Sequence, residues 1–205
     1  MNILYLASVC AQTRFDTLFK QGKITKMPQA QKYHHLLLEG LRKVSNDKIT
    51  VISSYPVNAD KRCYKQESEI ESGILYIYPG FIHVPFLRQL MIFFNTICLL
   101  VKLDVSKSGV IVCDVLTGSV CLAARVYRFF TGIKIVGIVT DVPGLTSGAR
   151  SKLLPYWKRK VRELMSIINK QSLAKYDAYL FLTYAMNEVV NLRNKPYIVI
   201  EGHSD

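Results

Sequence analysis

The amino-acid sequence predicts an α/β fold with a Rossmann-like, doubly wound, mostly parallel sheet and helices on both faces. Short apolar segments of strand length alternate with segments of helical periodicity along the chain. The strand segments are continuously apolar, which is typical of strands that are covered on both faces. No flexible linker and no internal repeat divides the 205 residues, so we expect one domain over residues 1–205.

The first half of the chain supplies the strand segments "NILYLA", "ITVISS" and "ILYIY". Between the first two, the polar residues 8–27 are expected to form a long loop without regular structure, and Pro28 opens a helix. A second, more apolar helix is expected over residues 86–103. Apolar residues spaced by three or four predict the core-facing stripe of the first helix: Tyr33, Leu37, Leu41 and Val44.

The second half repeats the alternation with the strand segments "GVIVCDV", "KIVGIVTD", "AYLFLT" and "YIVI". Helices are expected over residues 118–130, 154–175 and 184–193, and Gly132 ends the first of these. Ligands of parallel sheets bind beyond the carboxyl ends of the strands. The side chains that follow each strand are therefore the candidates for a site.

The formal net charge of +12 indicates an anionic partner, such as a phosphate-bearing substrate, an acidic membrane face or a nucleic acid. Nucleic acid ranks last, because the sequence has no zinc-ligand spacing, no RNP-type aromatic motif and no helix-turn-helix pattern. The five cysteines show no C-x-x-C spacing and are expected to be free thiols in a reducing cytoplasm. No metal site is predicted.

The chain is expected to be cytoplasmic and to contact the inner membrane face without spanning it. The start "MNILYLASVC" lacks the basic segment of a signal peptide and reads as a first strand. Within residues 81–101, the most apolar part is residues 90–101, where Asn95 and Thr96 are the polar side chains, and this length suits a buried or interfacial helix.

Glycine-rich phosphate loops are absent from the sequence. Neither G-x-G-x-x-G after the first strand nor G-x-x-x-x-G-K-[ST] occurs, so an NAD or ATP site of the usual kind is not expected and no cofactor is predicted. The loop after the first strand is instead basic, with Arg14, Lys20, Lys23 and Lys26.

Two carboxylates follow strands of the predicted sheet. Asp141, preceded by Thr140, ends the most apolar strand, where it can bind sugar hydroxyls and accept a proton, or simply hold a turn. Asp114 has a similar position but also suits capping of the next helix, which we favour. The full set of predicted acceptor-binding residues is Ser8, Arg14, Lys26, Asp114, Thr140 and Asp141, with Asp141 as the one catalytic candidate.

Other reactive side chains are expected to be structural. His34 and His35 have no second catalytic partner close in the sequence, so structural or surface roles are favoured over catalysis. Cys10 follows the first strand, but without a paired base we do not predict a nucleophile.

The helix expected over residues 154–175 carries the clearest charge signal. Eight basic residues and one acid, Glu163, fall between residues 150 and 175, and helical periodicity sets the basic face opposite an apolar one. Such a helix can lie on an anionic membrane or bind an anionic substrate, while the alternative is a packed helix with solvated charges. The residues predicted at this surface are Trp157, Lys158, Arg159, Arg162 and Lys170.

Three stretches, taken in order, carry a resemblance: "MNILYLAS", "KIVGIVTDVPG" and "KPYIVIEGHSD". They resemble the amino-terminal half of GT-B glycosyltransferases, nearest to glycosyltransferase family 4, over essentially the whole chain. The sequence departs from the family pattern at Thr140, where the family often has a functional His. It also has "CAQTRFD" in place of a glycine pair after the first strand, and Glu201 where Asn is usual.

The resemblance implies an amino-terminal acceptor-binding domain whose carboxy-terminal, nucleotide-sugar-binding domain is absent. It implies a hexosyltransferase-type activity in surface polysaccharide synthesis, with a glycan or lipid-linked acceptor. A nucleotide-sugar would bind only with a donor domain, and the chain alone is expected to be inactive. The alternatives are a non-catalytic, membrane-docking and acceptor-binding subunit that works with a separate catalytic chain, and an unrelated flavodoxin-like nucleotide-binding domain.

Overall fold

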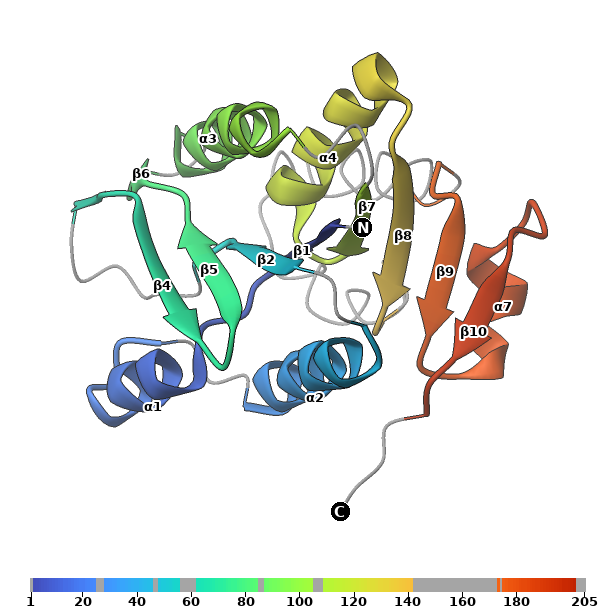
Figure 1. Ribbon diagram of the computed structural model, residues 1–205, viewed down its shortest axis with the longest axis horizontal. Helices are drawn as coiled ribbons and strands as arrows, with labels where there is room; N and C mark the ends of the chain where they lie inside the picture. Colours follow the sequence, from blue (N-terminus) through green and yellow to red (C-terminus); the bar gives the residue numbers. More distant parts are fainter. Residues whose placement is uncertain are drawn as a thin grey trace, which may run out of the picture. The chain divides into compact units, whose positions relative to one another are not determined.

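Figure 1 shows the computed structural model, which describes residues 2–24, 28–45, 48–55, 62–84, 87–104, 109–141, 173 and 175–201. The chain divides into two compact units, Met1–Ile135 and Val136–Asp205. Each unit contains parallel strands and at least one helix.

The first unit is built on five strands in the order β7-β1-β2-β5-β4. Their bounds are β1 (Asn2–Ala7), β2 (Lys48–Ser53), β4 (Glu67–Glu71), β5 (Ile74–Tyr78) and β7 (Gly109–Asp114). The pairs β1–β2, β1–β7 and β2–β5 are parallel, and β4 runs antiparallel to β5 at the edge. Successive parallel strands thus proceed from β1 to β5 in one direction and then resume at β7 on the other side of β1. The direction reverses between β1 and β7, which is the topological switch point of a Rossmann-like sheet.

Helices cover both faces of this sheet, which confirms the predicted doubly wound α/β class. The helices are α1 (Gln12–Lys20), α2 (Pro28–Val44), α3 (Leu87–Leu103) and α4 (Gly118–Thr131). In Figure 1, α1 and α2 lie on one face and α3 and α4 on the other. A short antiparallel pair, β3 (Cys63–Tyr64) with β6 (Phe81–Ile82), precedes α3. The core is the apolar interior between these layers, and five of the six residues of both β1 and β2 are buried.

The loop predicted over residues 8–27 is wrong in its central part, where the structure has the nine-residue helix α1. The helix is mostly polar, and Phe15 is its one buried residue. Its polar surface explains why periodicity did not indicate it.

The orientation predicted for α2 is also wrong. Its buried residues are Gln31, His34 and Leu38, whereas Val44, which the pattern placed in the core, is 84% exposed. Two polar side chains thus occupy the core-facing side. Buried polar groups are tolerated where they find hydrogen-bond partners, and both of these do.

Within its described residues, the second unit has three parallel strands in the order β10-β9-β8 and one helix. Their bounds are β8 (Lys134–Val139), β9 (Ala178–Phe181), α7 (Tyr184–Val190) and β10 (Tyr197–Val199). Gly137 in β8 lies under the ring of Tyr176, and a Cβ at this position would stand 3.1 Å from the ring carbon Cγ. A larger residue would therefore require the ring of Tyr176 to shift by a few tenths of an ångström.

No helix within the described part of the chain is long and apolar enough to cross a membrane. The longest described helices, α2 and α3, have 17 residues each. The expected apolar helix over residues 86–103 is α3, which packs on the first unit through one of its faces.

Candidate functional site

The carboxyl ends of β1, β2 and β7 meet at one edge of the first unit, at its topological switch point. Ser8 follows β1, and its Oγ donates a hydrogen bond to the backbone oxygen of Ser54, which follows β2, at 2.9 Å. The backbone N–H of Ser54 in turn donates to the oxygen of Ala7 at 3.0 Å. This edge is where a Rossmann-like sheet receives its ligand.

A chain of three buried polar side chains runs beneath this edge. The hydroxyl of Tyr5 lies 2.6 Å from Nδ1 of His34, and Nε2 of His34 lies 3.3 Å from Oδ2 of Asp114. With the ring hydrogen on Nε2, the imidazole accepts from the Tyr5 hydroxyl and donates toward the carboxylate. Burial, followed by the nearby Asp114 carboxylate, raises the pKa of Tyr5 well above its ordinary value, so this hydroxyl keeps its proton. The chain joins β1, α2 and β7.

Asp114 uses its other carboxylate oxygen to shape a turn. Oδ1 accepts from the backbone N–H of Leu116 at 3.1 Å, two residues along, which is an Asx turn. Thr117 is the N-cap residue of α4, and its N–H and hydroxyl both donate to the backbone oxygen of Asp114. The carboxylate therefore orients the approach to α4 and holds His34. The N-cap position that was favoured for Asp114 is occupied by Thr117, whose side chain makes no capping hydrogen bond.

The loop after β1 is held by α2. Gln31 bonds Cys10 twice: its Oε1 accepts from the Cys10 N–H at 3.1 Å, and its Nε2 donates to the Cys10 oxygen at 2.6 Å. Nε2 of His35 also lies 2.7 Å from that oxygen. Burial raises the pKa of the Cys10 thiol to about 12, so it is protonated at neutral pH and unsuited to act as a nucleophile.

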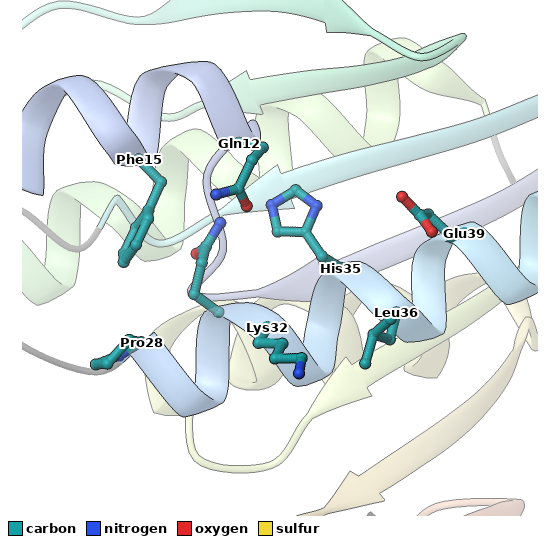
Figure 2. A pocket seen from close by; sticks show the side chains of 8 residues that line it. Gln12, Phe15, Pro28, Lys32, His35, Leu36 and Glu39 are labelled. Atoms are coloured by element: carbon teal, nitrogen blue, oxygen red, sulfur yellow. The ribbon is translucent and has the colours of Figure 1, made fainter. Parts of the chain in front are cut away.

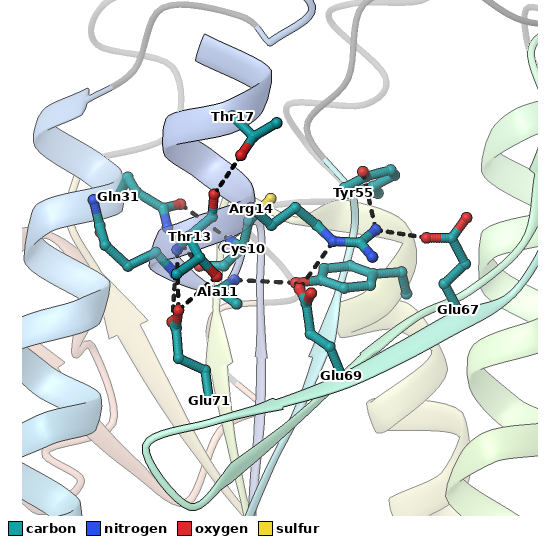
Figure 3. Close-up of polar contacts among 12 residues, drawn as sticks. Cys10, Ala11, Thr13, Arg14, Thr17, Gln31, Tyr55, Glu67, Glu69 and Glu71 are labelled. Atoms are coloured by element: carbon teal, nitrogen blue, oxygen red, sulfur yellow. Dashed lines mark hydrogen bonds and ion pairs between the residues drawn. The ribbon is translucent and has the colours of Figure 1, made fainter. Parts of the chain in front are cut away.

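Acidic and aromatic side chains surround Arg14 (Figure 3). Its guanidinium lies 2.6 Å from the carboxylate of Glu67, 2.9 Å from that of Glu69 and 3.1 Å from the hydroxyl of Tyr55. It also stacks over the rings of Tyr55 and Tyr78. Arg14 therefore ties α1 to the edge strand β4, and its charge is already satisfied by two carboxylates.

The amino terminus of α1 holds a carboxylate of the protein itself. Glu71, at the end of β4, accepts from the backbone N–H groups of Gln12 at 2.5 Å and Thr13 at 3.0 Å, and from the Thr13 hydroxyl at 2.8 Å (Figure 3). Desolvation raises the pKa of Glu71, but these hydrogen bonds outweigh it and the pKa falls below its ordinary value. In nucleotide-binding Rossmann folds, a phosphate occupies this helix terminus.

A pocket of about 320 Å³ opens between α1 and α2 (Figure 2). Phe15, Pro28 and Leu36 give it apolar walls, while Lys32 and His35 bring polar groups. His35 lines this pocket and also contacts the Cys10 oxygen, so the pocket adjoins the loop after β1.

The remaining predicted residues divide between the second unit and the undescribed part of the chain. Thr140 and Asp141 follow β8 directly and are both half-buried. The structure therefore places them at a strand end, as predicted, but no contact shown here tests their role. The residues that lie outside the described ones are Lys26, Trp157, Lys158, Arg159, Arg162 and Lys170.

The sequence analysis did not predict the acidic edge strand β4, which holds α1. Glu67, Glu69 and Glu71 alternate along β4 and all three reach α1. Their spacing by two was the available signal, since alternate residues of a strand share one face. No group of three or more His, Cys, Asp or Glu side chains within the described residues is arranged to hold a metal ion.

No protein-family model and no curated protein matches this chain. Several solved structures resemble it, and the following two are among them. A sucrose-phosphate synthase structure from Thermosynechococcus elongatus has 10% identity and a TM-score of 0.54, and the match covers 100% of this chain and 91% of that one. An α,α-trehalose 6-phosphate synthase from Burkholderia multivorans has 10% identity and a TM-score of 0.52, with 93% of this chain and 41% of that one covered. At this identity the likeness shows the fold, which is that of a Rossmann-like α/β protein.

Proposed function

We propose that this chain is the acceptor-binding half of a glycosyltransferase that moves a sugar from a nucleotide-sugar to a glycan or lipid-linked acceptor in surface polysaccharide synthesis. Both structural neighbours are named as synthases of phosphorylated disaccharides, and making a disaccharide requires a glycosyl transfer. The family resemblance of "MNILYLAS", "KIVGIVTDVPG" and "KPYIVIEGHSD" supports the same class.

The observation that carries the acceptor role is the Glu71 carboxylate at the amino terminus of α1. It receives the N–H groups of Gln12 and Thr13 that a Rossmann fold otherwise offers to a phosphate. A nucleotide diphosphate brought to this position would meet a negative charge. A sugar acceptor bound through hydroxyl groups does not depend on a free anion site there.

The acceptor contacts that we propose are the polar groups at the strand ends. Ser8 lies at the switch-point edge of the first unit, where the buried Asp114 supports it from below through His34 and the turn before α4, and Thr140 and Asp141 follow β8 in the second unit. Asp141 is the candidate for accepting a proton from the attacking hydroxyl. Arg14 contributes by holding the first loop in place, since its guanidinium is paired within the protein.

Acceptor binding is tested with the 205-residue chain and a panel of oligosaccharides, measured by saturation-transfer NMR and calorimetry. Asp141→Asn should weaken the bound oligosaccharide about tenfold, since a hydrogen bond to a charged group is lost. Asp16→Asn, an exposed carboxylate on α1, is the matched control and should change nothing. Failure of the wild-type chain to bind any oligosaccharide contradicts the proposal.

The reaction itself needs a domain that binds the nucleotide-sugar. Hydrogen-bond donors and cations positioned by that domain stabilise the diphosphate leaving group. We therefore expect the 205-residue chain to show no sugar transfer and no thermal shift with UDP-, GDP- or ADP-sugars. Turnover by the pure chain would overturn this part of the proposal.

A non-catalytic subunit that docks at the membrane and presents the acceptor to a separate catalytic chain is the second candidate. The internally paired Arg14 and Glu71 favour it, because neither is free for chemistry in this structure. Adding a purified GT-B donor domain distinguishes the two. Activity restored by an isolated donor domain supports the split enzyme, whereas activity only with a complete second enzyme supports the subunit.

A further inference from the structure

Helix α3 is apolar on two opposite sides. Its buried residues are Ile92, Thr96, Leu99 and Leu100. At 100° per residue, a second stripe lies on the far side of the helix from these, and it is exposed. The members of this stripe are Leu87, Leu90, Phe94, Cys98 and Val101. A helix that is apolar all round is normally covered on all sides, so the outer stripe of α3 lacks a partner in the described protein.

Helix α4 extends the same surface. It lies beside α3 on one face of the sheet (Figure 1), and Ser119 Oγ donates a hydrogen bond to Gln89 Oε1 across the contact. Large apolar side chains on α4 are also exposed: Leu122 at 44%, Phe129 at 84% and Phe130 at 79%. The outer stripe of α3 together with these three residues is called the α3–α4 surface.

The charged side chains of α3 and α4 are all basic, since neither helix contains Asp or Glu. One acid, the exposed Asp104, directly follows α3. Lys102, in the last turn of α3, and Lys134, at the start of β8, are exposed, and Arg125 and Arg128 of α4 are half-buried. Aromatic and aliphatic side chains with a cationic border complement the interface of an anionic bilayer, where apolar groups enter the acyl boundary and cations meet lipid phosphates.

We propose that the α3–α4 surface docks the protein on an anionic lipid bilayer. Phe94, Phe129 and Phe130 enter the interface, and Lys102 and Lys134 lie at the level of the phosphates. The proposal uses different residues from the basic segment at positions 150–175. It also stands apart from the proposed glycosyltransferase role, because it requires no acceptor and no chemistry.

Vesicle flotation of the 205-residue chain tests this proposal. Vesicles of phosphatidylcholine with 30% phosphatidylglycerol (about one anionic lipid in three) serve as the probe, and pure phosphatidylcholine vesicles serve as the neutral comparison. The triple variant Phe94→Gln, Phe129→Gln and Phe130→Gln should lower the lipid-bound fraction at least about fivefold, because all three side chains are exposed and available for insertion.

The matched control replaces equally exposed apolar residues elsewhere. Val44 is 84% and Leu192 is 80% exposed, so Val44→Gln with Leu192→Gln should leave flotation unchanged. Circular dichroism of each variant establishes that it is folded. Equal flotation of the wild type and the triple variant overturns the proposal, as does absence of the wild type from anionic vesicles. A dimer of the wild type in light scattering that the triple variant loses would instead assign the surface to a second copy of the chain.

Discussion

His34 links three elements of the first unit, because from α2 it connects Tyr5 of β1 to Asp114 of β7. His34→Leu should lower the free energy of unfolding by about 3 kcal/mol, since it leaves the buried carboxylate and the tyrosine hydroxyl without this partner. Urea unfolding followed by circular dichroism measures the loss.

A pair of tyrosine variants gives the matched control for this interior chain. Tyr5→Phe removes a bonded hydroxyl and should cost about 1 kcal/mol. Tyr33→Phe removes a buried hydroxyl that has no hydrogen-bond partner in the described structure, and it should be neutral or stabilising. Equal losses in the two variants would show that the Tyr5–His34 contact contributes nothing.

Glu71 makes stability depend on pH. Its pKa in the folded protein is lowered, so its contribution is fully present above the ordinary value of 4.5 and is lost as the pH falls through the folded value. Glu71→Gln should therefore cost about 0.5–1 kcal/mol at pH 7, the usual contribution of an anion at a helix amino terminus, and less at pH 3. Thermal unfolding at the two pH values measures it.

An exposed carboxylate on another helix controls for the general effect of charge. Glu188 lies on α7 and is exposed, so Glu188→Gln should change stability little at either pH. If Glu71→Gln destabilised the protein equally at pH 7 and pH 3, the charge of Glu71 would not be what holds the α1 terminus.

At the scale of elements, β4 depends on α1 for its place at the sheet edge. Arg14→Leu leaves Glu67 and Glu69 without their cation and removes the contacts to the two tyrosine rings. We expect faster hydrogen exchange in residues 67–71 and a stability loss of about 2 kcal/mol. Arg42→Leu, at an exposed position on α2, is the control and should leave exchange in β4 unchanged. Unchanged exchange in both variants would contradict this role of Arg14.

The sequence was sufficient for elements with a strong apolar pattern and insufficient for those stabilised by polar contacts. Residues 74–78 and 118–130 were placed within one residue, because continuous apolar strands and a glycine stop are local signals. Helix α1 and strand β4 were missed, because both are polar and their partners are distant in sequence: Glu71 bonds a residue 58 positions away. For the same reason the buried side of α2 was misplaced, since His34 and Gln31 are core residues only because Tyr5, Asp114 and Cys10 meet them.

The candidate site shows the same division. Ser8 and Asp114 were predicted as strand-end residues and do lie at the switch-point edge. Their contacts with Ser54 and His34 could not be foreseen, because each joins elements that are far apart in the sequence. The roles of Thr140 and Asp141 remain predictions of the sequence.

At the scale of the whole molecule, the dominant property is a formal net charge of +12. If only the total charge determined binding to an anionic surface, any four basic residues would contribute equally to it. The sequence instead concentrates basic residues between positions 150 and 175. A local cluster near the bilayer gains about 1 kcal/mol per cation, whereas charges beyond a Debye length of roughly 8–10 Å are screened. Removing basic residues from this segment and removing the same number elsewhere should therefore weaken binding to anionic vesicles by different amounts.

Two variants with the same loss of charge separate these outcomes. The first replaces the predicted contact residues Lys158, Arg159, Arg162 and Lys170 by Gln, and the second replaces four exposed lysines elsewhere: Lys20, Lys43, Lys48 and Lys65. Because only the first removes cations from the basic segment at positions 150–175, it should weaken binding to anionic vesicles at least about tenfold, and the second less than about twofold. Sedimentation with vesicles at about 0.1 M and about 0.5 M salt measures both, because the higher salt screens the attraction to the anionic surface more strongly. Equal weakening would mean that the overall charge, and not this segment, attracts the protein to anionic surfaces.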